Sequence, residues 1–336
     1  MPSSRRTGRV TLVEVAERAN CSVSLASIVM RGAPGASEQT RRRVRAVAEE
    51  IGYRPDQRAR ALRRSASGLI GVTFGVLQPF HAELVAGLYE AIGASGYEMV
   101  LSAVVGPVDD QQAVETLLTD RCEAIIMLAP AMGTRRLRAL AQEVPVVVVA
   151  RPMSVPGVDT VRIDDAGGQR LAVDRLVSAG HRRIVHVDGG RAPSAAERRS
   201  GYRAAMTAHG LGSRAAVVAG GLEEEDGARA VHDVLGLTER PTAITAFNDR
   251  CAAGMVQELA VRGIGVPDDI SVIGFDDSRR ARTCPVPLTT IDQDTRLMAR
   301  LALERAIGRA QQRYLATDQV LVPRLVERDS VAPAPR

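Results

Sequence analysis

The chain has 336 residues, 45% of them hydrophobic, which is enough for two or three domains that each bury a core. Its four cysteines lie far apart without a C-x-x-C pair, which argues against a disulfide framework and a zinc site and favours a reducing compartment. Residues 1–68 carry a net charge of +8 and residues 69–336 a net charge of −3, which predicts a polyanionic partner for the first segment and a separate task for the second.

The sequence gives no sign of export or of membrane insertion. Residues 1–9 lack the apolar core of a signal peptide, and no apolar run reaches membrane-spanning length. We therefore expect a cytoplasmic protein without a membrane partner. The glycine fingerprints that bind nucleotide phosphates and the H-E-x-x-H motif of zinc enzymes are missing, so we expect no cofactor and no metal.

Thr11 begins a segment whose apolar residues recur at helical spacing. Thr11 and Glu14 have the spacing of a capping box, in which each side chain accepts a hydrogen bond from the backbone N–H of the other residue. Asn20 tolerates a left-handed backbone and is predicted to end this helix. Ser22 is then predicted to cap a second short helix that runs through Met30.

A third helix is predicted from Ser37 to about Gly52, with an apolar face opposite a face rich in arginine. Two short helices joined by a tight turn and followed by a third are typical of a helix-turn-helix domain, although any small three-helix bundle fits the same pattern. In a helix-turn-helix domain, the second helix would enter the major groove of DNA, with Val23 and Ser24 in its exposed first turn.

The order of residues from Val10 to Pro55 resembles the DNA-binding head of the LacI/GalR repressor family. The shared features are the pattern V-T-x-x-[ED]-V-A-x-x-A, a seryl cap for the second helix and a closing G-Y-x-P that begins here at Gly52. The resemblance implies DNA contacts from the following residues of the head: Thr11, Ser22, Val23, Ser24, Ser27, Ile28, Arg31, Tyr53 and Arg54.

The second helix departs from the family pattern at two positions. Leu25 stands where the family usually has threonine, and Ile28 stands where it usually has arginine. An arginine can read guanine through O6 and N7, whereas Ile28 can only contact a thymine methyl group. We therefore expect an operator half-site that differs from the usual one, or a lower affinity.

Residues 56–68 are rich in arginine and by their charge alone read as a solvated linker. The family resemblance implies instead a hinge helix that folds when two copies meet in the minor groove of DNA. In that interpretation Leu62 wedges between base steps, Ala59 is its small neighbour, and Arg58 and nearby arginines hold phosphates.

From residue 69 onward, short apolar runs alternate with amphipathic stretches, which is typical of βαβ units with parallel sheets, and the length indicates two lobes. The predicted strands are Leu69–Val76, Glu98–Val104, Ala124–Leu128, Val144–Val149, Ile184–Asp188, Ala243–Ala246 and Ser271–Gly274. The predicted helices are Ala82–Ser95, Gln111–Arg121, Gly168–Gly180, Glu197–His209 and Asp226–Leu235.

This body also resembles the LacI/GalR family, through stretches such as VRIDDAGGQRLAVDRLVSAGHRRIVHVDG from Val161 and PTAITAFNDRCAAGMVQEL from Pro241. The resemblance implies an α/β body of two doubly wound lobes, like type I periplasmic binding proteins, behind an all-α helix-turn-helix domain. The predicted divisions are 1–55 for the head, ordered from about residue 10, 56–68 for the hinge, 69–329 for the body and 330–336 for a disordered tail. Within the body, the N-lobe takes about 69–161 plus 292–322, and the C-lobe about 163–290 plus 323–329.

Ligands of such folds bind at the carboxyl ends of the strands, where this sequence places several carboxylates and amides. These groups suit paired hydroxyls, and an arginine adds a forked donor. By resemblance, Arg198, Asn248 and Asp276 occupy effector-binding positions of the C-lobe, and Phe80 and His81 occupy positions of the N-lobe that often contact effector. Asp165 is a further candidate. Each acidic residue could equally be a helix cap.

We expect a ligand-controlled transcription factor, usually a repressor, that binds a pseudo-palindromic operator as a homodimer. Residues 80–93 and the stretch after Gln111 are the candidate dimer surfaces. The effector is expected to be a small carbohydrate-like or nucleoside-like molecule. The sequence leaves open whether its binding weakens or strengthens the binding of the protein to DNA. The alternatives are a solute-binding protein, which the basic head opposes, and a sugar-active α/β enzyme, for which no catalytic constellation is found.

Overall fold

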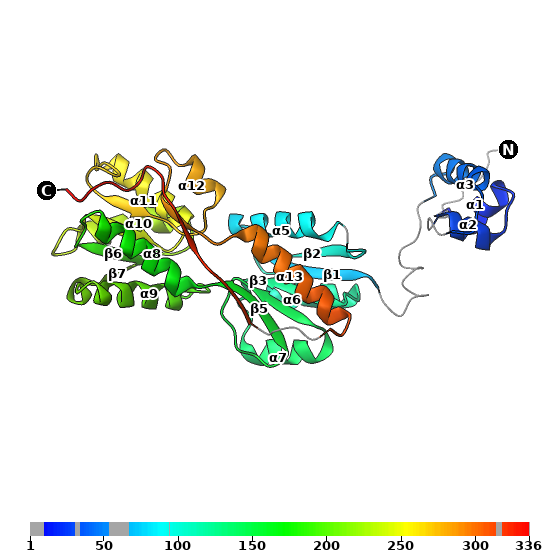
Figure 1. Cartoon of the computed structure of the whole chain (residues 1–336), viewed down its shortest axis with the longest axis horizontal. Helices are drawn as coiled ribbons and strands as arrows, with labels where there is room; N and C mark the ends of the chain where they lie inside the picture. The colour runs from blue at the N-terminus through cyan, green and yellow to red at the C-terminus, as the bar shows by residue number, and fades with distance from the viewer. Residues whose placement is uncertain (1–9, 31–33, 54–66, 94, 314–317, 336) are drawn as a thin grey trace. The chain divides into compact units, whose positions relative to one another are not determined.

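The computed structural model describes residues 10–30, 34–53, 67–93, 95–313 and 318–335, and the chain divides into two compact units, Met1–Ser67 and Gly68–Arg336 (Figure 1). The predicted DNA contacts at Arg31, Arg54, Arg58, Ala59 and Leu62 lie outside the described residues. In the part of the chain that is described, no helix combines the length and the apolarity needed to cross a bilayer.

Within its described residues, 10–30, 34–53 and 67, the first unit holds three helices around a small core. They are α1 (Leu12–Arg18), α2 (Val23–Met30) and α3 (Glu38–Glu50), which bury small and β-branched side chains such as Val15, Ala26 and Val44. The predicted start and end signals are confirmed, because the Thr11 capping box forms, Ser22 Oγ accepts from Leu25 N at 3.1 Å, and Asn20 adopts a φ of 46°.

The N-lobe of the second unit is built on a six-stranded parallel sheet in the order β11-β5-β4-β3-β1-β2. One face packs on α5 and α13, through residues such as Leu84 and Met298. The other face packs on α6 and α7, through residues such as Leu117 and Leu137. The strands are β1 (Leu69–Gly75), β2 (Glu98–Val104), β3 (Ala124–Leu128), β4 (Val146–Val149), β5 (Val158–Ile163) and β11 (Asp318–Leu321). The helices are α5 (Pro79–Ile92), α6 (Asp110–Thr119), α7 (Thr134–Glu143) and α13 (Thr295–Ala310).

The C-lobe repeats this architecture with a four-stranded parallel sheet in the order β7-β6-β8-β9. Alternation along β6 puts Ile184 against α8 and α9 and puts Val185 against α10 and α11. The strands are β6 (Ile184–Asp188), β7 (Ala216–Ala219), β8 (Ala243–Ala246) and β9 (Ser271–Ile273). The helices are α8 (Asp165–Ser178), α9 (Ala195–Ala208), α10 (Glu224–Leu235), α11 (Asp249–Val261) and the short α12 (Arg279–Thr283).

The chain passes between the two lobes three times. It leaves β5 for α8, leaves β10 (Thr290–Asp292) for α13, and leaves β11 for β12 (Arg324–Val326), which pairs antiparallel with β10. Figure 1 shows these segments between the lobes of the body. Arg324 Nη2 contacts carboxylates of Asp292 at 2.7 Å and of Asp294 at 3.2 Å, so it ties two of the crossings together.

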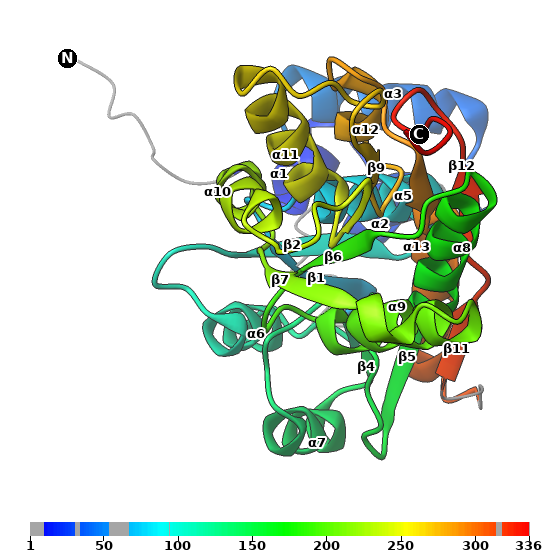
Figure 2. The ribbon, with the colours of Figure 1, turned by 90° about the vertical axis from the view of Figure 1, so that its left-hand side faces the viewer.

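The predicted disorder of residues 330–336 is wrong for the described residues 330–335. Ser330 is fully buried, and its Oγ accepts from Thr289 N and donates to the carbonyl of Val272. Ala334 N donates to Ala179 O at the end of α8, where the C-terminal segment lies in Figure 2. The proline-alanine composition suggested disorder, but the backbone of this segment finds hydrogen-bond partners on the C-lobe.

Candidate functional site

Helix α2 presents its first turn to solvent and its other side to the core of the head. Ala26 and Val29 are buried, whereas Ser22, Val23 and Ser24 are exposed, with Val23 at 44%. An exposed first turn on the second helix of the trio is the geometry by which helix-turn-helix domains reach base edges.

The remaining described residues of the predicted DNA surface are more enclosed or lie apart from α2. Ser27 and Ile28 are half-buried, and a Cβ placed on Gly35 would lie 3.9 Å from Ile28 Cγ2, so Ile28 packs beside the loop at Gly35. Tyr53 is also half-buried and packs against the core of the head, whereas Thr11 is exposed at the start of α1.

Arg198 on α9 is the centre of a buried polar cluster in the C-lobe. It is 5% exposed; its Nε donates to Asp165 Oδ1 at 2.8 Å, and its Nη1 donates to Phe247 O at 2.6 Å. Its guanidinium lies 3.6 Å from the ring centroid of Phe275 and 4.7 Å from that of Phe247. Cation–π contacts and a charge-assisted hydrogen bond therefore fix the orientation of this arginine.

Asp276, three residues after the end of β9, completes this cluster. Its Oδ1 lies 3.8 Å from Arg198 Nη1 and accepts from Gln293 Nε2 at 2.6 Å. Burial raises the pKa of Asp276 well above its usual range, against the opposing charge of Arg198. Its backbone φ of 123° is rare for any residue other than glycine. Such a strained conformation persists only where the surrounding contacts hold the residue in place.

Asn248 and Asp249 begin α11 at the end of β8, and both are engaged with protein groups. Asn248 Oδ1 accepts from Cys251 N at 2.8 Å as a helix cap, and its Nδ2 donates to Leu222 O at 3.1 Å. Asp249 is fully buried and accepts from Ser278 N at 2.8 Å and Thr290 Oγ1 at 2.6 Å; burial raises its pKa to about 7. Asp249 therefore joins α11 to the N-cap of α12 and to the start of β10.

Phe80 and His81 lie in the first turn of α5, on the N-lobe. Burial lowers the pKa of His81 to about 4, so the ring is neutral near pH 7. Its Nδ1 accepts from Gly75 N at 2.9 Å, which places the ring proton on Nε2. This histidine therefore has a single donor to offer on the side away from β1.

The structure brings Arg198, Asp165 and Asp276 into one cluster. Asn248 is next to this cluster in sequence, because it follows Phe247, whose carbonyl accepts from Arg198. The sequence missed three members of this cluster: Gln293, Phe247 and Phe275. The two rings directly precede predicted site residues at strand ends, which is the signal that could have found them. Because these rings are at most 3% exposed, they support Arg198 and offer no open face to a sugar. Among the described residues, no group of three or more His, Cys, Asp or Glu could hold a metal ion.

Comparison with known proteins agrees with this arrangement. Residues 11–56 match the bacterial regulatory proteins of the lacI family, and residues 173–331 match the periplasmic binding protein-like domain. The chain is 32% identical over 329 residues to the HTH-type transcriptional regulator GalR of Escherichia coli K12, covering 96% of each chain. The chain belongs to the LacI family of bacterial regulatory proteins.

Solved structures of the family share the fold of this LacI-family regulator. A LacI transcriptional regulator from a Rhodococcus species is 47% identical, with a TM-score of 0.77, over 79% of this chain and 99% of that one. The lac repressor dimer bound to operator and the anti-inducer ONPF is 28% identical, with a TM-score of 0.86, over 97% and 100%. The expected fold is confirmed, and the protein is a ligand-responsive, DNA-binding transcriptional regulator.

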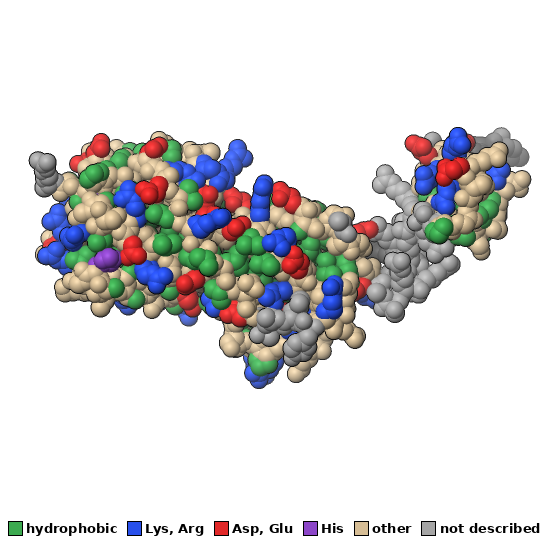
Figure 3. Space-filling view, in the orientation of Figure 1, with side chains coloured by type: hydrophobic (Ala, Val, Ile, Leu, Met, Phe, Trp, Pro, Cys, Tyr) green, Lys and Arg blue, Asp and Glu red, His purple; other side chains and the backbone are tan. Residues whose placement is uncertain are grey.

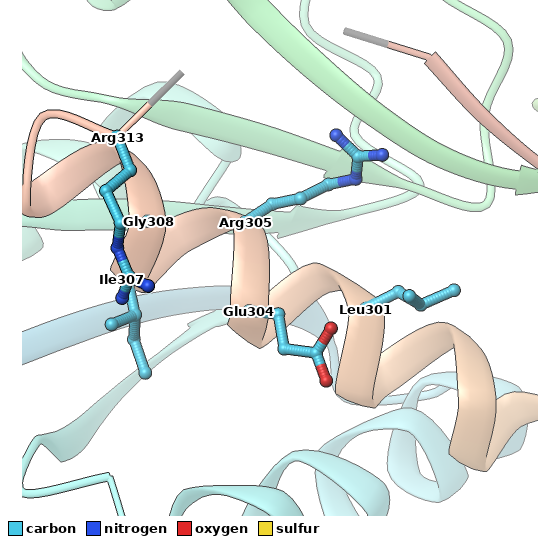
Figure 4. Close-up of a pocket in the computed structure, with 6 residues that line it drawn as sticks. All are labelled: Leu301, Glu304, Arg305, Ile307, Gly308 and Arg313. Carbon is cyan, nitrogen blue, oxygen red and sulfur yellow. The ribbon is translucent and has the colours of Figure 1, made fainter. Parts of the chain in front are cut away.

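A cavity of about 420 Å³ lies apart from the predicted effector residues of this LacI-family regulator (Figure 4). It runs along the second half of α13, and none of its lining residues belongs to the Arg198 cluster. Its lining is Leu301, Glu304, Arg305, Ile307, Gly308 and Arg313.

His186 on β6 gives the LacI-family body a pH-dependent stability. Its Nδ1 lies 3.1 Å from the carbonyl of Thr245 and so carries the ring proton, while its ring stacks on Tyr202. Burial lowers the pKa of His186 from 6.5 to about 4. The native protein therefore binds fewer protons than the unfolded chain between these values, and the stabilising contribution, present above pH 6.5, is lost as the pH falls towards 4.

We expect the free energy of unfolding of the native sequence to fall by about 2 kcal/mol more than that of His186→Asn between about pH 7.5 and about pH 5. Asparagine can keep the donor to Thr245 but does not titrate. Urea unfolding followed by circular dichroism at both pH values measures the difference. A gap between the two proteins that stays constant with pH would contradict the assignment.

Proposed function

We propose that this regulator represses transcription as a homodimer on a pseudo-palindromic operator, and that a small sugar-like molecule bound between its lobes modulates the affinity for DNA. The proposed effector site rests on Arg198, whose buried, permanently charged guanidinium is oriented by Asp165 and by the rings of Phe247 and Phe275. A rigid fork of donors with the Asp276 carboxyl group 3.8 Å away suits a ligand whose hydroxyls both donate and accept.

The proposed effector contacts come from both lobes, so that binding favours lobe closure. The C-lobe offers oriented donors and acceptors around Arg198, and the N-lobe offers the first turn of α5. The proposed set is Phe80, His81, Asp165, Arg198, Asn248 and Asp276. Family neighbours include a lac repressor that was solved with operator and a small anti-inducer, which supports a site of this kind.

A homodimer is supported by apolar side chains on the N-lobe. Tyr89 on α5 is 54% exposed, Leu101 on the edge strand β2 is 36% exposed, and Val105 just beyond it is 41% exposed. Exposed apolar groups on adjacent elements are typical of an interface between subunits. The face of the body in Figure 3 otherwise mixes arginine with acidic side chains, which fits a body that does not itself bind a polyanion.

We infer that the protein acts by binding and not by catalysis, in the cytoplasm where bacterial DNA lies. Asp249, one of the buried acids whose pKa is raised and which an enzyme could use for acid-base chemistry, already accepts hydrogen bonds from Ser278 and Thr290. Turnover assays with candidate sugars test the enzyme alternative directly.

A thermal-shift screen of sugars, sugar phosphates and nucleosides tests the proposal. A ligand at 100 times its Kd stabilises the native state by about 2.7 kcal/mol, which raises the melting temperature measurably. The active compound should then change the affinity of the dimer for DNA fragments from around its gene. A monomer with no preference for any such fragment over random DNA contradicts the proposal.

A further inference from the structure

Several polar contacts join the two lobes through residues that do not belong to the three crossover segments. Arg250 Nη1 donates to Leu77 O at 3.0 Å, and Gln78 Nε2 donates to Glu223 Oε1 at 3.2 Å. Arg250 also forms an ion pair with the carboxylate of Glu223. Each of the first two bonds has one partner in the N-lobe and one in the C-lobe.

A further contact lies nearby on α5. Glu83 Oε1 accepts from the backbone N–H of Arg279 at 2.9 Å, at the start of α12. All the N-lobe partners therefore belong to the loop before α5 and to its first two turns. All the C-lobe partners belong to the first turns of α10, α11 and α12 or the residue before them.

We propose that Leu77, Gln78, Glu83, Glu223, Arg250 and Arg279 form an interlobe latch that holds the cleft closed without a ligand and so sets the effector concentration to which the regulator responds. Hinge opening about the crossovers breaks the latch contacts together, because they share one seam. A latch that favours the closed state raises the apparent affinity of any ligand that binds only that state.

Arg250 is the residue on which the latch depends most. Its forked guanidinium bonds a carbonyl of one lobe and a carboxylate of the other, and its side chain is only 21% exposed. The Glu223 carboxylate pairs with Arg250 and accepts a hydrogen bond from Gln78. It is therefore linked to the N-lobe directly through Gln78 and indirectly through the bond from Arg250 to Leu77. Partial burial lessens the screening of such pairs by salt, although it does not remove it.

The latch shares its helical turns with the proposed effector residues. Asn248 lies two residues before Arg250, and its Nδ2 donates to Leu222 O, directly before Glu223. Gln78 lies two residues before Phe80. Opening the latch therefore moves the two walls of the proposed pocket apart, which couples the two sites through the same rigid elements.

Glu83 adds an electrostatic link between the lobes. Its negative charge contributes to the raised pKa of the Asp276 carboxyl, although burial is the larger cause. The charge of Glu83 near Asp276 therefore opposes closure, whereas the hydrogen bond that Glu83 accepts from Arg279 N favours closure. A ligand hydroxyl that hydrogen-bonds to Asp276 would stabilise the closed state separately from the latch contacts.

The test compares Arg250→Ala and Glu83→Ala, which removes the acceptor of Arg279 N, with a matched control at the C-cap of α11, Arg262→Ala. Arg262 pairs with Glu258 of α11 at 2.7 Å, so its removal takes away an arginine without changing a contact to the N-lobe. Spin labels at two exposed positions, Arg138 on α7 and Asp233 on α10, report the distance between the lobes in the full chain without ligand.

We expect a longer label distance in Arg250→Ala and Glu83→Ala than in the native sequence, and no change in Arg262→Ala. Molar salt should lengthen the distance in the native sequence as well. With an effector from the screen, half-saturation in Arg250→Ala should need about five times more ligand, because the closed state is less populated. Unchanged distances in both latch variants would overturn the proposal, as would an equal change in the control.

The effector readout rests on the proposed function, whereas the ligand-free distance does not. If no compound binds but Arg250→Ala still opens the cleft, the proposed effector fails and the latch stands. If a compound binds with the same affinity and the same closed distance in native and variant proteins, the latch fails and the proposed effector stands.

Discussion

Arg198→Met is expected to abolish the response to the effector and to lower the free energy of unfolding by about 3–5 kcal/mol. The substitution leaves Asp165 as a carboxylate that is 3% exposed and has lost the donor at 2.8 Å. Methionine is chosen because its flexible side chain can still fill the space between the Phe275 and Phe247 rings. Urea unfolding gives the stability, and operator release with increasing ligand gives the response.

A matched double variant separates the two roles of this residue. In Arg198→Met with Asp165→Asn, the buried charge is gone, so most of the lost stability should return. The response to the effector should stay absent, because the forked donor is still missing. If the double variant responds to ligand at the native concentration, Arg198 does not contact the effector and only supports the fold.

Features that depend on neighbouring residues could be predicted from the sequence. The Thr11 and Ser22 caps, the left-handed Asn20 and the ends of β2, β3, β6 and β8 all match, because capping needs partners within three residues and buried parallel strands are continuous apolar runs. The predicted start of α5 at Ala82 is late. The helix begins at Pro79, which fits a first turn whose N–H groups have no helical partner.

Features that depend on distant residues could not be predicted. The strands β10, β11 and β12 are three or four residues long and each contains a charged residue, so no apolar run marks them in the sequence. The order at Ser330 comes from bonds to Val272 and Thr289, which lie 58 and 41 residues away. No local pattern records such a partner.

The candidate site shows the same division. The family resemblance pointed to Arg198, Asn248 and Asp276, and Asn248 and Asp276 also follow predicted strands, which end at one edge of a parallel sheet. The pairing of Arg198 with Asp165 and Gln293 with Asp276 depends on how segments fold together, as does the interlobe latch, whose hydrogen-bonded partners lie 145 to 196 residues apart.

Ser24→Glu is expected to weaken operator binding by about 100-fold or more without changing the free energy of unfolding by more than about 0.5 kcal/mol. Ser24 is exposed in the first turn of α2, so the fold tolerates the change. In the complex, the added carboxylate would face the phosphates and the acceptor-rich edges of the bases, where it is repelled and loses its water. Fluorescence anisotropy with a labelled operator measures the affinity.

Ser24→Gln is the control for size, because glutamine has nearly the shape of glutamate without its charge. It should weaken operator binding far less than Ser24→Glu and shift the preference among operator sequences, since an amide can both donate and accept at base edges. Affinity for the effector should be native in both variants, because Ser24 belongs to the other compact unit of the chain. If Ser24→Glu bound the operator with native affinity, the first turn of α2 would not face DNA. Another part of the head would then contact the base edges.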